Sequence, residues 1–90
     1  MNETAIKRYF DITDEQWCRL CRQHRAILWF IYKTGSITPM DAFVELNITK
    51  LSTRVSEMKV IGVQFGQSYE SRKNQFGMTS HYMRYRRAAA

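Results

Sequence analysis

The segment from Ile37 to Lys59 constrains the fold most, because it carries the signals for two short helices joined by a tight turn. Thr38 can accept a backbone hydrogen bond as the N-cap, Pro39 suits the first helical position, and Asp41 stands where a reciprocal cap belongs. Asn47 can end this helix, because its side chain tolerates a left-handed backbone. The sequence therefore predicts a helix between Thr38 and Asn47.

The second helix of this unit is expected to begin with Thr49 as its N-cap. Its apolar residues recur at spacings of four and three, which places them on one buried side; they are Leu51, Val55 and Met58. Ala42 in the first helix is small enough to let the second helix cross it closely. Two short helices with a tight turn between them are typical of a helix-turn-helix unit.

The outward side of the second helix carries short polar residues of the kind that fits a DNA major groove. With about 100° between successive residues, the candidates to face bases are Thr49, Lys50, Ser52, Thr53, Ser56 and Glu57. Arg54 and Lys59 lie on the flanks, where long cationic side chains reach phosphates more easily than base edges. The alternative is the solvated side of an ordinary amphipathic helix.

The charge of the chain favours the DNA interpretation. Ninety residues with 44% hydrophobic composition predict one folded domain, and a formal net charge of +6 with a pI near 9.7 favours a polyanionic partner. The cations gather in the last part of the sequence. We expect no signal peptide, no membrane span and a cytoplasmic location, and we expect residues 88–90 to be a linker or fusion remnant.

The N-terminal part is expected to supply apolar residues that pack behind the helix-turn-helix unit. Thr13 begins a second capping box, and apolar residues repeat at helical spacing from there until Gly35, which predicts one long helix or two abutting ones starting at 14. Leu28 and Ile31 would pack onto the helix-turn-helix unit. The basic residues Arg19, Arg22 and Arg25 would form a ridge outside.

The C-terminal part changes to an alternating pattern, which predicts a hairpin. Val63, Phe65 and Tyr69 would share one side of the first strand, and residues 78–85 would form the second strand. Residues 70–77 would form a long basic tip between them. On the second strand, alternation places Arg84 and Arg86 on one side, and Met83 and Tyr85 on the other.

This order of elements resembles the winged helix-turn-helix proteins. More narrowly, the stretches Gly35–Ala42, Leu46–Ile48 and Leu51–Met58 resemble small helix-turn-helix domain proteins of phages and prophages. The resemblance covers roughly residues 23–87 and leaves 1–22 as an extension. It implies an α+β, mostly α winged fold, binding to double-stranded DNA, and a phage or mobile-element origin.

In a winged domain the hairpin lies along the DNA backbone or in the minor groove beside the recognition helix. The residues expected to contact phosphates from the hairpin are therefore Arg72, Lys73 and Asn74 at its tip and Arg84 and Arg86 on its second strand. The sequence leaves two biological roles open: a regulator of transcription, and an architectural or excision factor.

Some residues would suit chemistries or partners other than DNA. Cys18, Cys21 and His24 have the spacing of metal ligands, but a fourth ligand is missing, so we expect no metal site and Cys21 as a small core residue. We expect no cofactor and no enzymatic activity, since no catalytic constellation is present. A winged scaffold that binds a host protein through exposed aromatic residues (Trp29, Phe30, Tyr32 or Phe76) is the alternative function. Self-association through the N-terminal helix also stays open.

Overall fold

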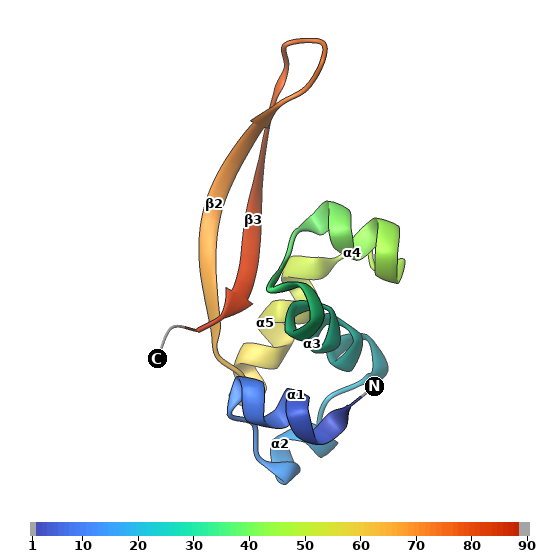
Figure 1. Ribbon diagram of the computed structural model, residues 1–90, viewed down its shortest axis with the longest axis vertical. Helices are drawn as coiled ribbons and strands as arrows, with labels where there is room; N and C mark the ends of the chain where they lie inside the picture. Colours follow the sequence, from blue (N-terminus) through green and yellow to red (C-terminus); the bar gives the residue numbers. More distant parts are fainter. Residues whose placement is uncertain (1, 89–90) are drawn as a thin grey trace.

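A computed structural model describes residues 2–88 and shows a helical body from which a long hairpin projects (Figure 1). The elements in chain order are α1 (Glu3–Phe10), α2 (Asp14–Cys18), α3 (Arg22–Thr34), β1 (Ser36–Ile37), α4 (Pro39–Leu46), α5 (Leu51–Ile61), β2 (Phe65–Lys73) and β3 (Thr79–Arg87). This arrangement confirms the predicted α+β, mostly helical winged fold. Of the predicted tail 88–90, residues 89 and 90 lie outside the described residues.

The local signals around α4 form as predicted. The Thr38 hydroxyl accepts a hydrogen bond from the Asp41 backbone N–H at 3.2 Å, and the Asp41 carboxylate accepts one from the Thr38 N–H at 3.0 Å. Pro39 occupies the first helical position, and Asn47 adopts a left-handed backbone with φ 57° after the last turn. The chain therefore turns sharply toward α5 at the residue that the sequence indicated.

The start of α5 differs from the prediction. Thr49 is not the N-cap, because α5 begins at Leu51 and Lys50 occupies the cap position without any side-chain hydrogen bond. The turn is instead held by Ile48, which is 3% exposed, and by the Ile48 N–H bond to the Ala42 carbonyl. Burial of Ile48 therefore fixes the turn, and Thr49 and Lys50 stay exposed at the head of the helix.

Between Thr13 and Gly35 the chain forms two helices, α2 and α3, which is one of the two arrangements expected there. A further helix, α1, precedes residue 14, is capped by the Asn2 side chain and was not predicted. The capping box at Thr13 is confirmed and starts α2. A separate start for α3 comes from the Cys21 N–H, which donates to Nδ1 of His24 at 3.1 Å.

The core is shared between the extension and the rest of the chain. Its members from the first 22 residues are Ile6, Phe10, Ile12, Trp17 and Leu20, and all are buried. Leu28 and Ile31 of α3 join Ala42 and Leu51 of the helix-turn-helix unit in the same cluster, as predicted. The extension is therefore packed into the body.

The basic ridge was predicted incorrectly at one position. Arg25 does not point outward, because its guanidinium lies over the Trp17 ring at 4.8 Å and donates to the Trp17 carbonyl at 2.9 Å. Arg19 and Arg22 are exposed, as expected. Arg25 thus joins α2 to α3, which an i, i+3 pattern of charges alone could not reveal.

The sheet has three antiparallel strands in the order β1-β3-β2. The predicted long tip at 70–77 was wrong, because β2 continues to Lys73 and pairs with β3 up to Thr79. Tyr69 lies on β2, the first strand of the hairpin, as expected; it is 69% exposed, and its ring stacks on that of His81. On β3, Tyr85 is buried while Arg84 and Arg86 lie on the opposite side, which confirms the predicted alternation.

Candidate nucleic-acid interface

The outward side of α5 is open and carries short hydroxyl side chains. Leu51, Val55 and Met58 are at most 3% exposed and bury the opposite side against the core. Ser52, Thr53 and Ser56 are exposed. This surface can approach a DNA groove closely, because its side chains are small and its backbone is held by burial on the far side.

Glu57 differs from the other base-facing candidates because its carboxylate has partners within the chain. Oε1 of Glu57 lies 2.7 Å from a guanidinium nitrogen of Arg54 and 2.9 Å from Nε2 of His24. Since Nδ1 of His24 accepts the Cys21 N–H, the other ring nitrogen, Nε2, is the one that donates to Glu57. The hydrogen bond from His24, supported by Arg54, lowers the pKa of Glu57.

This contact ties the start of α3 to the middle of α5. His24 is 6% exposed, whereas the Glu57 side chain is 44% exposed, so the pair lies at the edge of the outward surface. Arg54 is drawn toward Glu57 along the same helix. Of the two flanking cations, Arg54 therefore has an acidic neighbour before any ligand arrives.

Lys59, the other flanking cation, connects α5 to the hairpin. Its ammonium donates a hydrogen bond to the Gln67 side-chain oxygen on β2. The base of the hairpin is thereby held beside the last turn of α5. From there the hairpin rises past the first turn of α5 and beyond α4 (Figure 1).

The outer half of the hairpin carries two exposed cations, Arg72 and Lys73. Within residues 2–88, neither of them forms an ion pair. Asn74, the third predicted tip contact, has a structural role, because its side-chain oxygen accepts the N–H groups of Phe76 and Met78 at 2.9 and 3.0 Å. Asn74 thus closes the turn that carries the tip.

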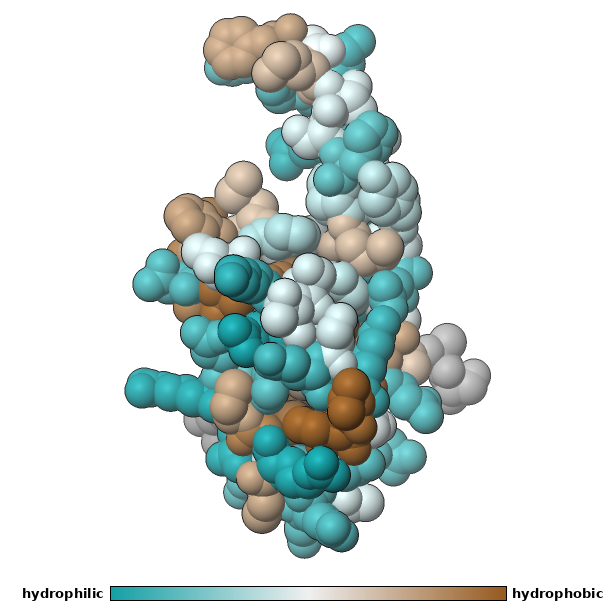
Figure 2. All heavy atoms as spheres, turned by 180° about the vertical axis from the view of Figure 1, so that it is seen from behind, coloured by the Kyte–Doolittle hydropathy of each residue, from teal (hydrophilic) through white to brown (hydrophobic). Residues whose placement is uncertain are grey.

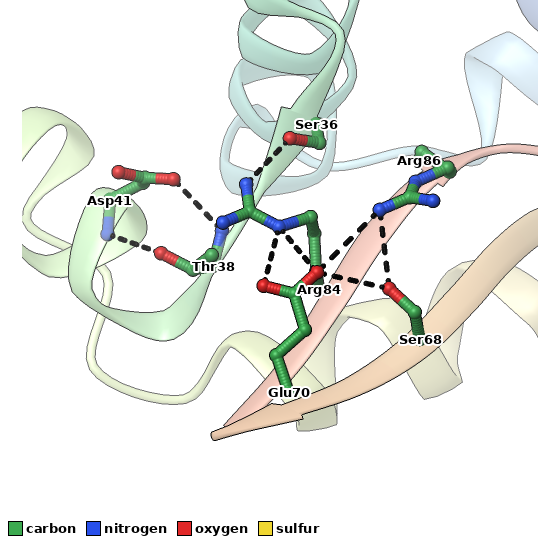
Figure 3. A network of polar contacts seen from close by, with 7 residues as sticks. All are labelled: Ser36, Thr38, Asp41, Ser68, Glu70, Arg84 and Arg86. Carbon is green, nitrogen blue, oxygen red and sulfur yellow. Dashed lines mark hydrogen bonds and ion pairs between the residues drawn. The ribbon is translucent and has the colours of Figure 1, made fainter. Parts of the chain in front are cut away.

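Arg84 and Arg86 hold the hairpin in place (Figure 3). Nε of Arg84 donates to both Glu70 oxygens at 3.0 and 2.9 Å, and Nη1 donates to the Ser36 hydroxyl at 2.8 Å. Arg86 donates to the Ser68 hydroxyl at 3.1 Å. The Arg84 hydrogen bond lowers the pKa of Glu70, and the same pair raises the pKa of Arg84. This network joins all three strands.

A groove of about 770 Å³ lies between the start of α4 and the outer hairpin. The α4 side contributes residues 38–41, and the hairpin side contributes residues 72–76, 80–82 and 84. Its hairpin wall is basic and its α4 wall contains Asp41. The hairpin tip is consequently separated from the helical body.

The cysteines do not occupy the predicted place. Cys21 is exposed, as is Cys18, so the prediction of a core cysteine was wrong. His24 uses both ring nitrogens for Cys21 and Glu57. Among residues 2–88, no group of three potential metal ligands is present, and none of the described helices has the length and apolar character needed to span a membrane.

Two exposed apolar groups lie outside the outward surface of α5. Met40, Phe43 and Val44 are 68%, 55% and 64% exposed on α4, at spacings that place them on one side of that helix. Phe76 and Met78 are 78% and 64% exposed at the hairpin tip. Sequence reasoning missed the α4 group, although its spacing was a detectable signal, whereas it named Phe76 as an exposed aromatic residue.

The fold and the site together define a small winged-helix DNA-binding domain: a helix-turn-helix with an open second helix, followed by a basic hairpin. The chain matches the winged helix-turn-helix domain family over residues 22–87 and belongs to that family. Neither the curated proteins nor the solved structures contain a significant match to it. Membership in this family supports binding to double-stranded DNA.

Proposed function

We propose that this protein binds double-stranded DNA sequence-specifically, with α5 in the major groove and the hairpin on the backbone or in the minor groove. The observation that carries the proposal is the exposed hydroxyl surface of α5 beside a basic hairpin. A groove-reading helix needs short polar groups for base edges and nearby cations for phosphates. Both are present in this chain.

The residues take different roles in this proposal. Lys50, Ser52, Thr53 and Ser56 contact base edges, with Thr49 beside them. Arg54, Lys59, Arg72 and Lys73 contact phosphates. Asn74 shapes the hairpin tip, while Arg84 and Arg86 act mainly by holding the hairpin, since Glu70 and Ser68 engage their guanidinium groups. Glu57 orients Arg54 and can accept a hydrogen bond from a cytosine amino group only by sharing its carboxylate.

The resemblance to phage and prophage proteins supports a proposal for the biological role. We propose a transcriptional regulator or an architectural or excision factor of a phage or other mobile element. A single small domain has a limited interface, so tight specific binding calls for a dimer on a palindrome, cooperative binding or a second protein.

The test begins with selection of bound fragments from a random duplex pool, followed by affinity measurements on the enriched site. Thr53→Ala and Ser56→Ala should change which bases are preferred, whereas Lys73→Ala should weaken all sequences alike. Each lost phosphate contact lowers the slope of log affinity against log salt by about 0.9. The proposal would be contradicted if no duplex sequence were enriched, or if the affinity did not change with salt concentration.

A second candidate function is binding to a host protein through the same scaffold. It is favoured by the exposed apolar side of α4, formed by Met40, Phe43 and Val44. Of the aromatic residues first considered, Trp29 and Phe30 pack against the core, and only Phe76 is widely exposed. This candidate predicts capture of one stoichiometric protein that Phe43→Ser abolishes, together with no binding to any duplex at low salt.

A further inference from the structure

The hairpin tip combines exposed apolar side chains with neighbouring cations, in a stretch of the hairpin that contains no acidic residue. Phe76 is 78% exposed and Met78 64% exposed, and Figure 2 shows hydrophobic atoms at the extreme end of the molecule. From Ser71 to Arg87 the sequence contains no Asp or Glu. The last acidic residue before this stretch, Glu70, is paired with Arg84. The tip therefore presents apolar side chains at the end of a positively charged hairpin.

The turn that carries Phe76 is ordered by its own hydrogen bonds. The Asn74 N–H donates to the Met78 carbonyl at 2.8 Å, and the Gly77 N–H donates to the Asn74 carbonyl at 3.0 Å. The Asn74 side chain adds the two bonds to the N–H groups of Phe76 and Met78. Gly77 has φ 81°, a conformation that glycine adopts without strain. Phe76 is thus presented on a preorganised support.

The body of the protein gives this tip nothing to pack against. Residues 71–81 are all exposed, so the outer half of both strands stands in solvent. Two large apolar side chains exposed together at such a place indicate a contact with another molecule, since the burial of apolar surface is favourable. The cations and the lack of carboxylates in this half of the hairpin favour a polyanion over a protein as that contact.

We propose that Phe76, with Met78 beside it, enters the DNA minor groove as a wedge, partly unstacks one base step and bends the duplex. Arg72 and Lys73 would bind the phosphates on either side. Apolar side chains that enter base steps from the minor groove bend DNA by about 20 to 90° toward the major groove. This inference rests on the proposed DNA-binding function and adds an activity to it, namely deformation of the DNA.

The experiment measures binding and bending separately on one duplex that contains the selected site. Energy transfer between dyes at the two ends reports bending, 2-aminopurine placed at successive steps reports unstacking, and anisotropy reports affinity. The compared proteins are the wild type, Phe76→Ser, and Tyr69→Ser as a matched control, since Tyr69 is an exposed aromatic residue of the same hairpin that lies away from its tip. Thermal unfolding of each variant checks that the fold is intact, which is expected because both side chains are exposed.

We expect the wild type and Tyr69→Ser to increase energy transfer and 2-aminopurine fluorescence at one step. Phe76→Ser should still bind, with affinity reduced about tenfold or less, but should lose both signals. The inference is overturned if the saturated wild-type complex leaves the duplex straight, or if Phe76→Ser bends it equally. If the wild type binds no duplex at all, the proposed DNA-binding function itself fails, and the wedge fails with it.

Discussion

Replacing Ile6 with alanine tests whether the N-terminal extension is part of the folded domain. Ile6 lies on α1, outside the segment that matches the winged helix-turn-helix family, yet its side chain is 0% exposed. Two neighbours of Ile6 on α1 make aromatic contacts. The ring centroid of Tyr9 lies 5.4 Å from that of Tyr32 on α3, and the ring centroid of Phe10 lies 5.9 Å from that of Phe65 at the hairpin base. Loss of Ile6 should therefore loosen α1 from both α3 and the hairpin.

The magnitude follows from the burial. Truncation of a fully buried isoleucine to alanine costs about 3 kcal/mol, in a range of roughly 2 to 5, because transfer energy is lost and a cavity remains. A domain of this size has a free energy of unfolding of about 5 to 13 kcal/mol. Since each kcal/mol lowers the Tm of such a domain by about 4 to 8 °C, Ile6→Ala should lower it by roughly 12 to 24 °C.

Thermal and chemical unfolding followed by circular dichroism measure this effect. The matched control is Val60→Ala, because Val60 is also a β-branched residue in a helix but is 84% exposed. Both substitutions raise helix propensity, so the difference between the two variants in free energy of unfolding reports the contribution of burying Ile6. The control should stay within about 0.5 kcal/mol of the wild type. An Ile6→Ala protein as stable as Val60→Ala would refute the docking of α1 and would make the extension dispensable.

Further outcomes can be stated for the caps and carboxylates. Thr38→Ala should lower stability by about 1 kcal/mol in denaturant titration, with Thr38→Ser close to the wild type, because the hydroxyl caps α4. The pKa values of Glu57 and Glu70 lie below their ordinary value of 4.5 in the fold, so their contribution is complete above that pH and is lost as pH falls through the lowered values. Acid titration should show this loss, and Glu70→Gln should reduce it; an unchanged acid profile in Glu70→Gln would contradict the role of the Arg84 contact.

The parts of the fold that sequence could predict are those with local causes. The limits of α4 were correct, because Thr38, Asp41 and Asn47 act on groups within four residues of themselves. The buried stripe of α5 was correct for the same reason, since its spacing is a property of one helix. α1 was missed although Asn2 is a good N-cap and Ile6 and Phe10 are four residues apart, since the segment is short and highly charged.

What could not be predicted depends on partners far along the chain. His24 and Glu57 are separated by 33 positions, so no local pattern marks their hydrogen bond. The hairpin was predicted too short because Ser71, Arg72 and Lys73 are polar on both sides of the strand. They extend β2 because β3 pairs with them, and strand preference depends on such pairing more than on intrinsic propensity.

The two halves of the hairpin differ in how they are held: the base packs against the body, and the outer half is exposed. This difference determines how variants of the hairpin should be interpreted. At its base, Tyr85 is buried and Arg84 binds Glu70 and Ser36, so the direction of the hairpin relative to α5 is fixed. In the outer half, residues 71–81 are exposed. A change at the base displaces the tip relative to α5, and should therefore alter binding to every sequence. A change confined to Phe76 leaves that direction intact, so any loss of bending can be attributed to the tip side chain itself.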